Sequence, residues 1–198
     1  STKNPYFFDG DVELRQTQEA RLGNCCPAPL DHPNIRLGSD LLRLWPEAYS
    51  QFKLLIRGVY ALIDPQQTED NVVGSSCGSG FDGHASIAAT VTHHVGFAEA
   101  LVHEMAHYKL RCLGIDFESA DRIITNPQNA RYQSPIRYDC LRPMSAVLHA
   151  QYSYTHIAAL DINIVLHTDD RARNLQVMTK SMAVIVPKLE FGLKTLKE

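Results

Sequence analysis

Residues 94–113 read HVGFAEALVHEMAHYKLRCL and contain the motif His103-Glu104-Met105-Ala106-His107. Side chains four positions apart lie one above the other on a helix, so the two imidazoles can bind one metal ion. Gly114 follows the last apolar position, where helices often end. The stretch therefore predicts a helix that carries two ligands of a metal site. The alternative interpretation is a pair of surface histidines with Glu104 as a solvated neighbour.

The rest of the chain predicts a mostly helical protein with few strands, because hydrophobic spacing is helical over most segments. The expected elements before the motif are an extended stretch at 1–10, helical character at 11–22, a loop at 23–33, a helix over 40–45 with Ser39 as its N-cap, a helix from Pro46 to about Ile63, and strands at 71–74 and 85–91 joined by a turn-rich segment. The expected elements after it are a short helical piece at 118–124, a long helix from Pro143 to about His167, and a helix from Asp170 to Val186 that ends at Pro187.

We predict an α+β, mostly helical fold with a zincin-like arrangement. In that arrangement a small sheet precedes the motif helix, and a downstream helix carries the third metal ligand. The length of 198 residues predicts a single catalytic domain. Within it, residues 1–38 are expected to form an irregular N-terminal arm and residues 39–198 the core around the motif.

Composition excludes several classes of protein. The hydrophobic fraction is 44%, the charged fraction is 21% and the net charge is -3 without a basic run, which argues against a dedicated nucleic-acid binder. No apolar run reaches transmembrane length, so no membrane association is expected. Five cysteines at irregular spacing do not resemble a disulfide framework. We expect reduced thiols and a cytoplasmic protein, and leave assembly into a homo-oligomer open.

A catalytic metal site needs a third protein ligand. Leu113 stands where the extended zinc-peptidase motif has its third histidine, so the ligand must come from elsewhere. His149 is the first candidate, because it lies early in the downstream helix, with Tyr152 and His156 on the same face. The other candidates are His156 and the carboxylates Glu118, Asp121, Asp139 and Asp161.

Two metal chemistries fit this pattern. With zinc, Glu104 would act as the general base that activates water, as in a peptidase. With Fe(II), three protein ligands leave room for a 2-oxo acid and O₂, and an arginine fork would hold the distal carboxylate. The segment at 132–143 contains Arg137 and Arg142 directly ahead of His149. Two arginines there favour the oxygenase, whereas the alternative is a surface loop with a local Arg–Asp pair.

Taken together, these motifs resemble a known family. The series Leu101-Val102-His103-Glu104-Met105-Ala106-His107-Tyr108-Lys109-Leu110, then Ser134-Pro135-Ile136-Arg137-Tyr138-Asp139, Arg142-Pro143 and Val147-Leu148-His149-Ala150, is similar to the HExxH-type 2-oxoglutarate-dependent β-hydroxylases of peptides. The resemblance covers about residues 40–165. It implies natural-product peptide modification as the setting.

The resemblance also implies roles for individual residues. His103, His107 and His149 would bind Fe(II), and Arg142, or else Arg137, would hold the carboxylate of the cosubstrate 2-oxoglutarate. Glu104 would orient the substrate or a water molecule. The expected function is therefore hydroxylation, with O₂, of an unactivated carbon, chiefly Cβ, of a residue in a peptide or of a related small amino acid.

Two other hypotheses remain open. One is a zinc metallopeptidase that uses Glu104 as its general base. The other is a non-catalytic interaction domain that retains the motif.

Overall fold

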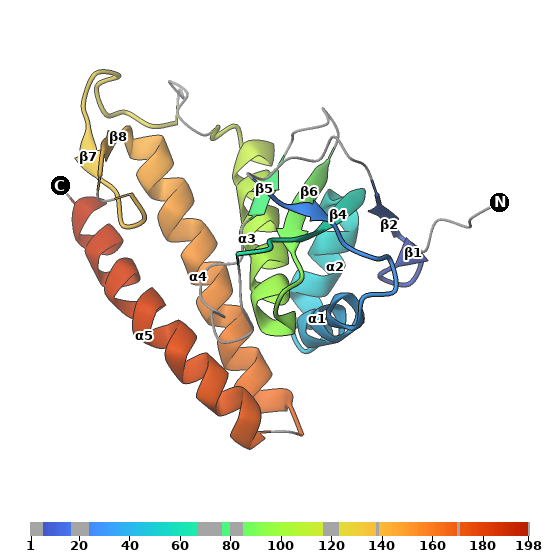
Figure 1. The fold of residues 1–198 in the computed structure, drawn as a ribbon. Coiled ribbons are helices and arrows are strands. Elements are labelled where there is room, and N and C mark those ends of the chain that lie inside the picture. The colour runs from blue at the N-terminus through green and yellow to red at the C-terminus, as the bar shows by residue number, and fades with distance from the viewer. Residues whose placement is uncertain are drawn as a thin grey trace.

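The fold is mixed α and β and mostly helical, as predicted. The computed structural model describes residues 6–16, 24–66, 77–79, 85–116, 123–137, 139–169 and 171–197 (Figure 1). Within these ranges the helices are α1 (Pro33–Arg43), α2 (Pro46–Leu55), α3 (His94–Cys112), α4 (Met144–His167) and α5 (Arg171–Thr195). The strands are β1 (Tyr6–Phe7), β2 (Val12–Arg15), β3 (Cys26–Pro27), β4 (Gly58–Ile63), β5 (Cys77–Ser79), β6 (Ser86–Thr90), β7 (Tyr132–Gln133) and β8 (Leu141–Arg142).

One mixed sheet forms the N-terminal half. Its described strands run in the order β1-β2-β4-β6-β5, and β3 pairs with β4 away from this path. The three strands β2, β4 and β6 are parallel, whereas β5 lies antiparallel to β6 at an edge. β4 and β6 are buried along almost their whole length, as expected for strands that are covered on both faces.

The helices stack outward from this sheet. Figure 1 shows α3 between the sheet and α4, with α5 on the far side of α4. Gly38 allows α1 to pack closely on the start of α3, because a Cβ atom there would lie 2.8 Å from the carbonyl oxygen of His94. The Asn34 amide donates hydrogen bonds to the carbonyls of Val91 and Thr92, which ties α1 to the turn before α3. These contacts fix the position of the helix that carries the motif.

The motif helix and the long helix after it are confirmed. α3 begins at His94, and the side chain of His93 caps it by accepting a hydrogen bond from the Val95 amide. Gly114 follows with a φ of 81°, the left-handed conformation expected just beyond a helix end. α4 ends at His167, and Pro143 stands as its N-cap residue. The strand expected at 85–91 is confirmed as β6.

Several predictions before the motif helix were wrong. Helical character was expected at 11–22, but Val12–Arg15 forms β2, which pairs with β4. Ser39 does not cap a helix; it lies inside α1, and its hydroxyl donates to the carbonyl of Ile35. The first helix begins instead at Pro33, where the imidazole of His32 accepts a hydrogen bond from the Asn34 amide.

The expected helix from Pro46 to Ile63 was also wrong in its second half. α2 ends at Leu55, and the segment after Ile56 turns into β4. The apolar run 58–63 is buried on both faces of the sheet, and a run of this kind does not show whether it is a strand or a buried helix. The turn-rich segment after 74 likewise contains a strand, β5.

The C-terminal helix is longer than predicted. Pro187 was expected to end it, but α5 continues through this proline to Thr195. Leu189, beyond the proline, packs against the hydrophobic core, and this packing holds the last turns in place. The strand expected at 71–74 lies outside the described residues, as does most of the helical piece expected at 118–124.

The expected N-terminal arm, residues 1–38, contributes β1, β2, β3 and the first turns of α1 in its described part. Among the described helices, none combines the length and apolarity needed to cross a membrane.

Candidate metal centre

α3 brings His103, Glu104 and His107 together at its face toward α4. One ligand atom from each of the three lies within 4.8 Å of the others. The Nε2 atoms of the two histidines are 3.0 Å apart, and Glu104 Oε1 is 3.9 Å from His103 Nε2. Two imidazole nitrogens that bind one ion at about 2.1 Å and at about a right angle are separated by about 3.0 Å. The spacing of the two histidines therefore fits a shared ion.

His149 on α4 joins this pair. It is fully buried, and its Nδ1 lies 2.9 Å from Nδ1 of His107. Its other nitrogen, Nε2, lies 2.9 Å from the carbonyl oxygen of Ile115, just after α3. A carbonyl only accepts hydrogen bonds, so Nε2 of His149 carries the proton and Nδ1 carries the lone pair.

Burial holds the imidazoles of His103 and His107 in the neutral form. Burial, and the neighbouring His103 and His149, lower the pKa of His107 to about 2. Burial also lowers the pKa of His103, with the carboxylate of Glu104 acting in the opposite direction. Neutral imidazole is the form that binds a metal, so the site needs little proton release before an ion can enter.

The orientation of His149 bears on its predicted role as third ligand. Its lone pair faces Nδ1 of His107, whereas the spacing of His103 and His107 suits an ion at their Nε2 atoms. The ring of His107 cannot bind one ion through both of its nitrogens, one of which faces His103 and the other His149. His149 can therefore reach that ion only after one of the two rings rotates. In this ring orientation His149 orients His107 by accepting its Nδ1 proton, the arrangement by which buried partners position metal-binding histidines.

The two predicted arginines lie in different settings. Arg137 is 56% exposed and forms a two-pronged ion pair with Asp139, with both N···O distances at 2.8 Å. This is the local surface pair that the sequence left as an alternative, and it occupies the fork of Arg137. Arg142 is half-buried in β8, two positions before α4 begins at Met144. Of the two, Arg142 is the better placed beside the helix of His149.

His156, the second candidate for third ligand, belongs to a different cluster. Its Nδ1 donates to the carbonyl of Tyr152 at 2.9 Å, and its Nε2 lies 2.8 Å from Nζ of Lys109. The rings of Trp45 and Tyr152 lie at 5.8 Å and 4.5 Å from it. No motif in the sequence placed Lys109 beside His156, so this cluster was missed. Its signal in the sequence was weak, because the residues come from α3, from α4 and from Trp45, which stands just before α2.

The remaining candidates lie away from the imidazoles or outside the described residues. Glu118 and Asp121 fall outside them. Asp139 pairs with Arg137, and Asp161 contacts Ser181 in the core between α4 and α5. The stacked rings of His93 and His94 mark the start of α3, about two turns or more from the motif.

Two comparisons with known proteins found no relative of this chain. No protein-family model matches this chain, and no curated protein matches it. The similarity to peptide β-hydroxylases therefore rests on the quoted motifs alone.

Proposed function

We propose that this chain is an Fe(II)- and 2-oxoglutarate-dependent oxygenase that hydroxylates an unactivated carbon of a residue in a peptide. The observation that carries the proposal is a row of three imidazoles between two packed helices, in which His107 lies 3.0 Å from His103 through Nε2 and 2.9 Å from His149 through Nδ1. When bound there, Fe(II) would couple the oxidative decarboxylation of 2-oxoglutarate to hydroxylation of the substrate with O₂.

The chain's own residues would bind and orient the reactants. His103 and His107 would hold the ion through Nε2, and His149 would be either the third ligand or the group that orients His107. Arg142 would bind the distal carboxylate of 2-oxoglutarate through its planar fork. Glu104, only 3% exposed, would orient the substrate beside the ion and help to exclude water.

A peptide substrate is supported by the sheet edge. β5 contacts α3 and is an edge strand of the described sheet, where it pairs only with β6. An extended peptide can add to such an edge through main-chain hydrogen bonds. An edge strand beside the motif helix is also the basis of the zincin-like arrangement that we propose for the finer fold class.

The test uses 2-oxoglutarate itself, because it needs no knowledge of the peptide. The protein is loaded anaerobically with Fe(II) and titrated with 2-oxoglutarate, and the visible charge-transfer band of the chelated iron is followed. We expect a saturable band that His103→Ala abolishes and that Arg142→Ala shifts to higher 2-oxoglutarate concentration. The matched variant Arg137→Ala should leave the titration unchanged. Stoichiometric zinc with no such band would overturn the proposal.

The second candidate function is a zinc metallopeptidase, favoured by the close approach of Glu104 to His103. In that case Glu104 would take the proton of the attacking water. Glu104→Gln distinguishes the two functions. A peptidase variant would lose nearly all cleavage of a mixed peptide library, whereas the oxygenase variant would keep the 2-oxoglutarate band.

A further inference from the structure

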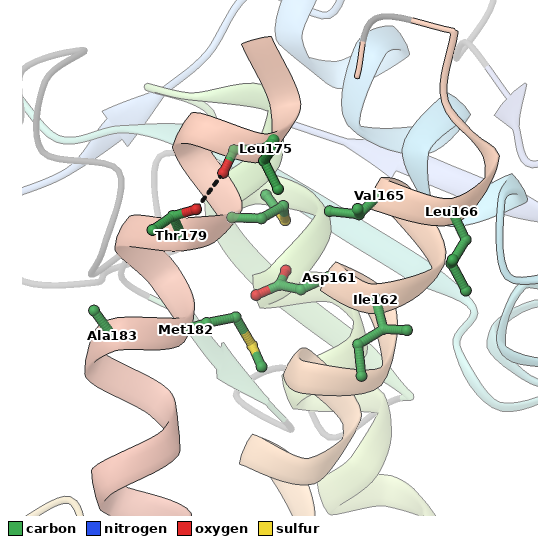
Figure 2. Close-up of a pocket in the computed structure, with 9 residues that line it drawn as sticks. Asp161, Ile162, Val165, Leu166, Leu175, Thr179, Met182 and Ala183 are labelled. Carbon is green, nitrogen blue, oxygen red and sulfur yellow. Dashed lines mark hydrogen bonds between the residues drawn. The ribbon is translucent and has the colours of Figure 1, made fainter. Parts of the chain in front are cut away.

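A groove of about 500 Å³ lies between α4 and α5, remote from the imidazoles (Figure 2). Its apolar walls come from Ile162, Val165 and Leu166 on α4 and from Leu175, Met178 and Met182 on α5. Three of these side chains, Ile162, Leu166 and Leu175, are more than half exposed at its rim. Its volume lies in the range of small-molecule sites, roughly 300–1,000 Å³. Asp161 lies about 18 Å along α4 from His149 at 1.5 Å per residue, so this is a separate site.

Asp161 forms the floor of the groove, and Figure 2 shows its carboxylate between the two helices. It is 1% exposed and belongs to a buried polar cluster. The hydroxyl oxygen of Ser181 lies 2.9 Å from Asp161 Oδ2 and 2.8 Å from Oε1 of Glu99, which is also buried. The cluster thus links α3, α4 and α5.

The proton count in this cluster makes Asp161 the charged member. The Ser181 hydroxyl has one proton and can donate to only one carboxyl group, so the other carboxyl must donate to it. Burial first, and then the charge of Asp161, raise the pKa of Glu99 well above its usual range. Burial raises the pKa of Asp161 only to about 6. At pH 7.5 Glu99 therefore holds the proton, and Asp161 is a carboxylate that accepts from Ser181.

The protonated carboxyl group of Glu99 also hydrogen-bonds to the Asp161 side chain. Apart from that carboxyl group, no hydrogen-bond donor in the described part of the chain reaches Asp161 Oδ1. A buried carboxylate oxygen without a donor is costly, on the order of 1–3 kcal/mol or more. Met178 and Met182 line the groove from α5, and methionine is the apolar side chain that adjusts most readily to a ligand.

The second polar group of the groove is also an acceptor. Thr179 Oγ1 donates its proton to the carbonyl of Leu175 at 2.7 Å, the bond drawn as a dashed line in Figure 2, so it can only accept from a ligand. Two acceptors, one of them charged, in an apolar groove select a ligand that donates hydrogen bonds and carries positive charge. Anions are repelled, and a hydrated metal ion would find one carboxylate among hydrocarbon walls.

We infer that the α4–α5 groove is a binding site for a small primary amine with an apolar body, whose ammonium group pairs with Asp161. The apolar body would cover the exposed side chains at the rim, and the ammonium would donate to Asp161 Oδ1 and Thr179 Oγ1. This site does not depend on metal chemistry at His103, so either proposal can fail alone.

Isothermal titration with 4-phenylbutylamine and its uncharged analogue 4-phenylbutan-1-ol tests the site at pH 7.5. We expect one amine to bind per chain, at least tenfold more tightly than the alcohol. Asp161→Asn keeps the shape of the side chain and should remove the preference for the amine. Met182→Trp should fill the groove and weaken both ligands at least tenfold, while Leu193→Trp, an exposed site on α5 outside the groove, should change neither.

Three results would overturn the inference. They are equal binding of amine and alcohol, unchanged amine binding in Met182→Trp, and a dimer in sedimentation that Met182→Trp dissociates while the parent binds no amine. The last result would show that a second copy of the chain covers the groove. Circular dichroism checks that each variant folds. If Asp161→Asn does not fold, Met182→Trp still tests the site, because it leaves the buried carboxylates unchanged.

Discussion

The Nδ1 atoms of His107 and His149 lie 2.9 Å apart across the interface between α3 and α4. Since His149 Nε2 donates to the carbonyl of Ile115, its Nδ1 must accept the proton of His107. His107 then presents a lone pair at Nε2, where His103 Nε2 lies 3.0 Å away. A carbonyl in the loop after α3 thereby fixes, through two imidazoles, the tautomer of a nitrogen that could bind a metal ion.

Removal of His149 should therefore weaken metal binding. If His149 positions His107, His149→Ala should lower the affinity for Zn(II) or anaerobic Fe(II) by roughly 10–100-fold, the usual effect of losing such a partner. If it is a ligand, the loss should match that of His103→Ala. The metal-dependent rise in Tm measures both effects, because a bound metal stabilises the folded state by an amount that grows with the logarithm of its affinity.

His156→Ala is the matched control for this experiment, since His156 lies seven positions later on α4 and contacts Lys109 instead. Its metal-dependent Tm shift should equal that of the parent. Parent-like metal affinity in His149→Ala would show that the contact with His107 has no role in the site.

The elements that carry the site could be predicted because their patterns were long and well bounded. α3 has nineteen residues between a capping side chain at His93 and Gly114, and α4 has twenty-four beginning after Pro143. Both are longer than the roughly 11–18 residues over which the spacing of apolar side chains distinguishes a helix from a strand. The meeting of His103 and His107 followed directly from helical geometry.

The errors occurred where local sequence was ambiguous. β4 is a continuous apolar run directly after a helix, and its identity depends on β2 and β6, which lie far away in the sequence. Contacts of this kind override local preference. The ring orientation of His149 was equally unpredictable, because the carbonyl of Ile115 that sets it comes from another element. The same holds for the Lys109–His156 contact.

Gly38 should tolerate no side chain, although it lies in a helix. Alanine has a higher helix propensity than glycine by about 1 kcal/mol. A Cβ at this position would nevertheless meet the carbonyl oxygen of His94 at 2.8 Å and Phe97 Cδ1 at 2.7 Å. The backbone of α3 cannot move away cheaply, so Gly38→Ala should destabilise the protein by about 1–3 kcal/mol, the usual cost of overpacking. Urea denaturation measures this, and a stabilised variant would contradict the close packing of α1 on α3.

Asp9 should matter for stability through its charge as well as its backbone. Its φ is 59°, and its carboxylate accepts hydrogen bonds from Tyr49 and Arg43, which lowers its pKa to about 2. A lowered pKa gives stability that is present above about pH 4 and lost as the pH falls toward 2. Asp9→Asn tolerates the same backbone but removes the charge, so its deficit in unfolding free energy should shrink over that range. A deficit that does not change with pH would show that the charge is unimportant.

The contribution of Asp161 to stability should depend on pH in the opposite direction to that of Asp9. Burial raises its pKa from the usual 3.8 to about 6, so between these values the folded state binds more protons than the unfolded state. Its contribution to stability is therefore fully present below about pH 4 and is lost as the pH rises to 6, which corresponds to on the order of 3 kcal/mol. Asp161→Asn does not titrate, so its unfolding free energy relative to the parent should increase from pH 4 to pH 6 and then level off. Asp139→Asn is the matched control, because the pKa of Asp139 is lowered to about 2 by Arg137 and its difference should stay flat over the same range. A flat difference for Asp161→Asn as well, measured by urea denaturation, would mean that the Asp161 carboxyl group does not carry the buried charge.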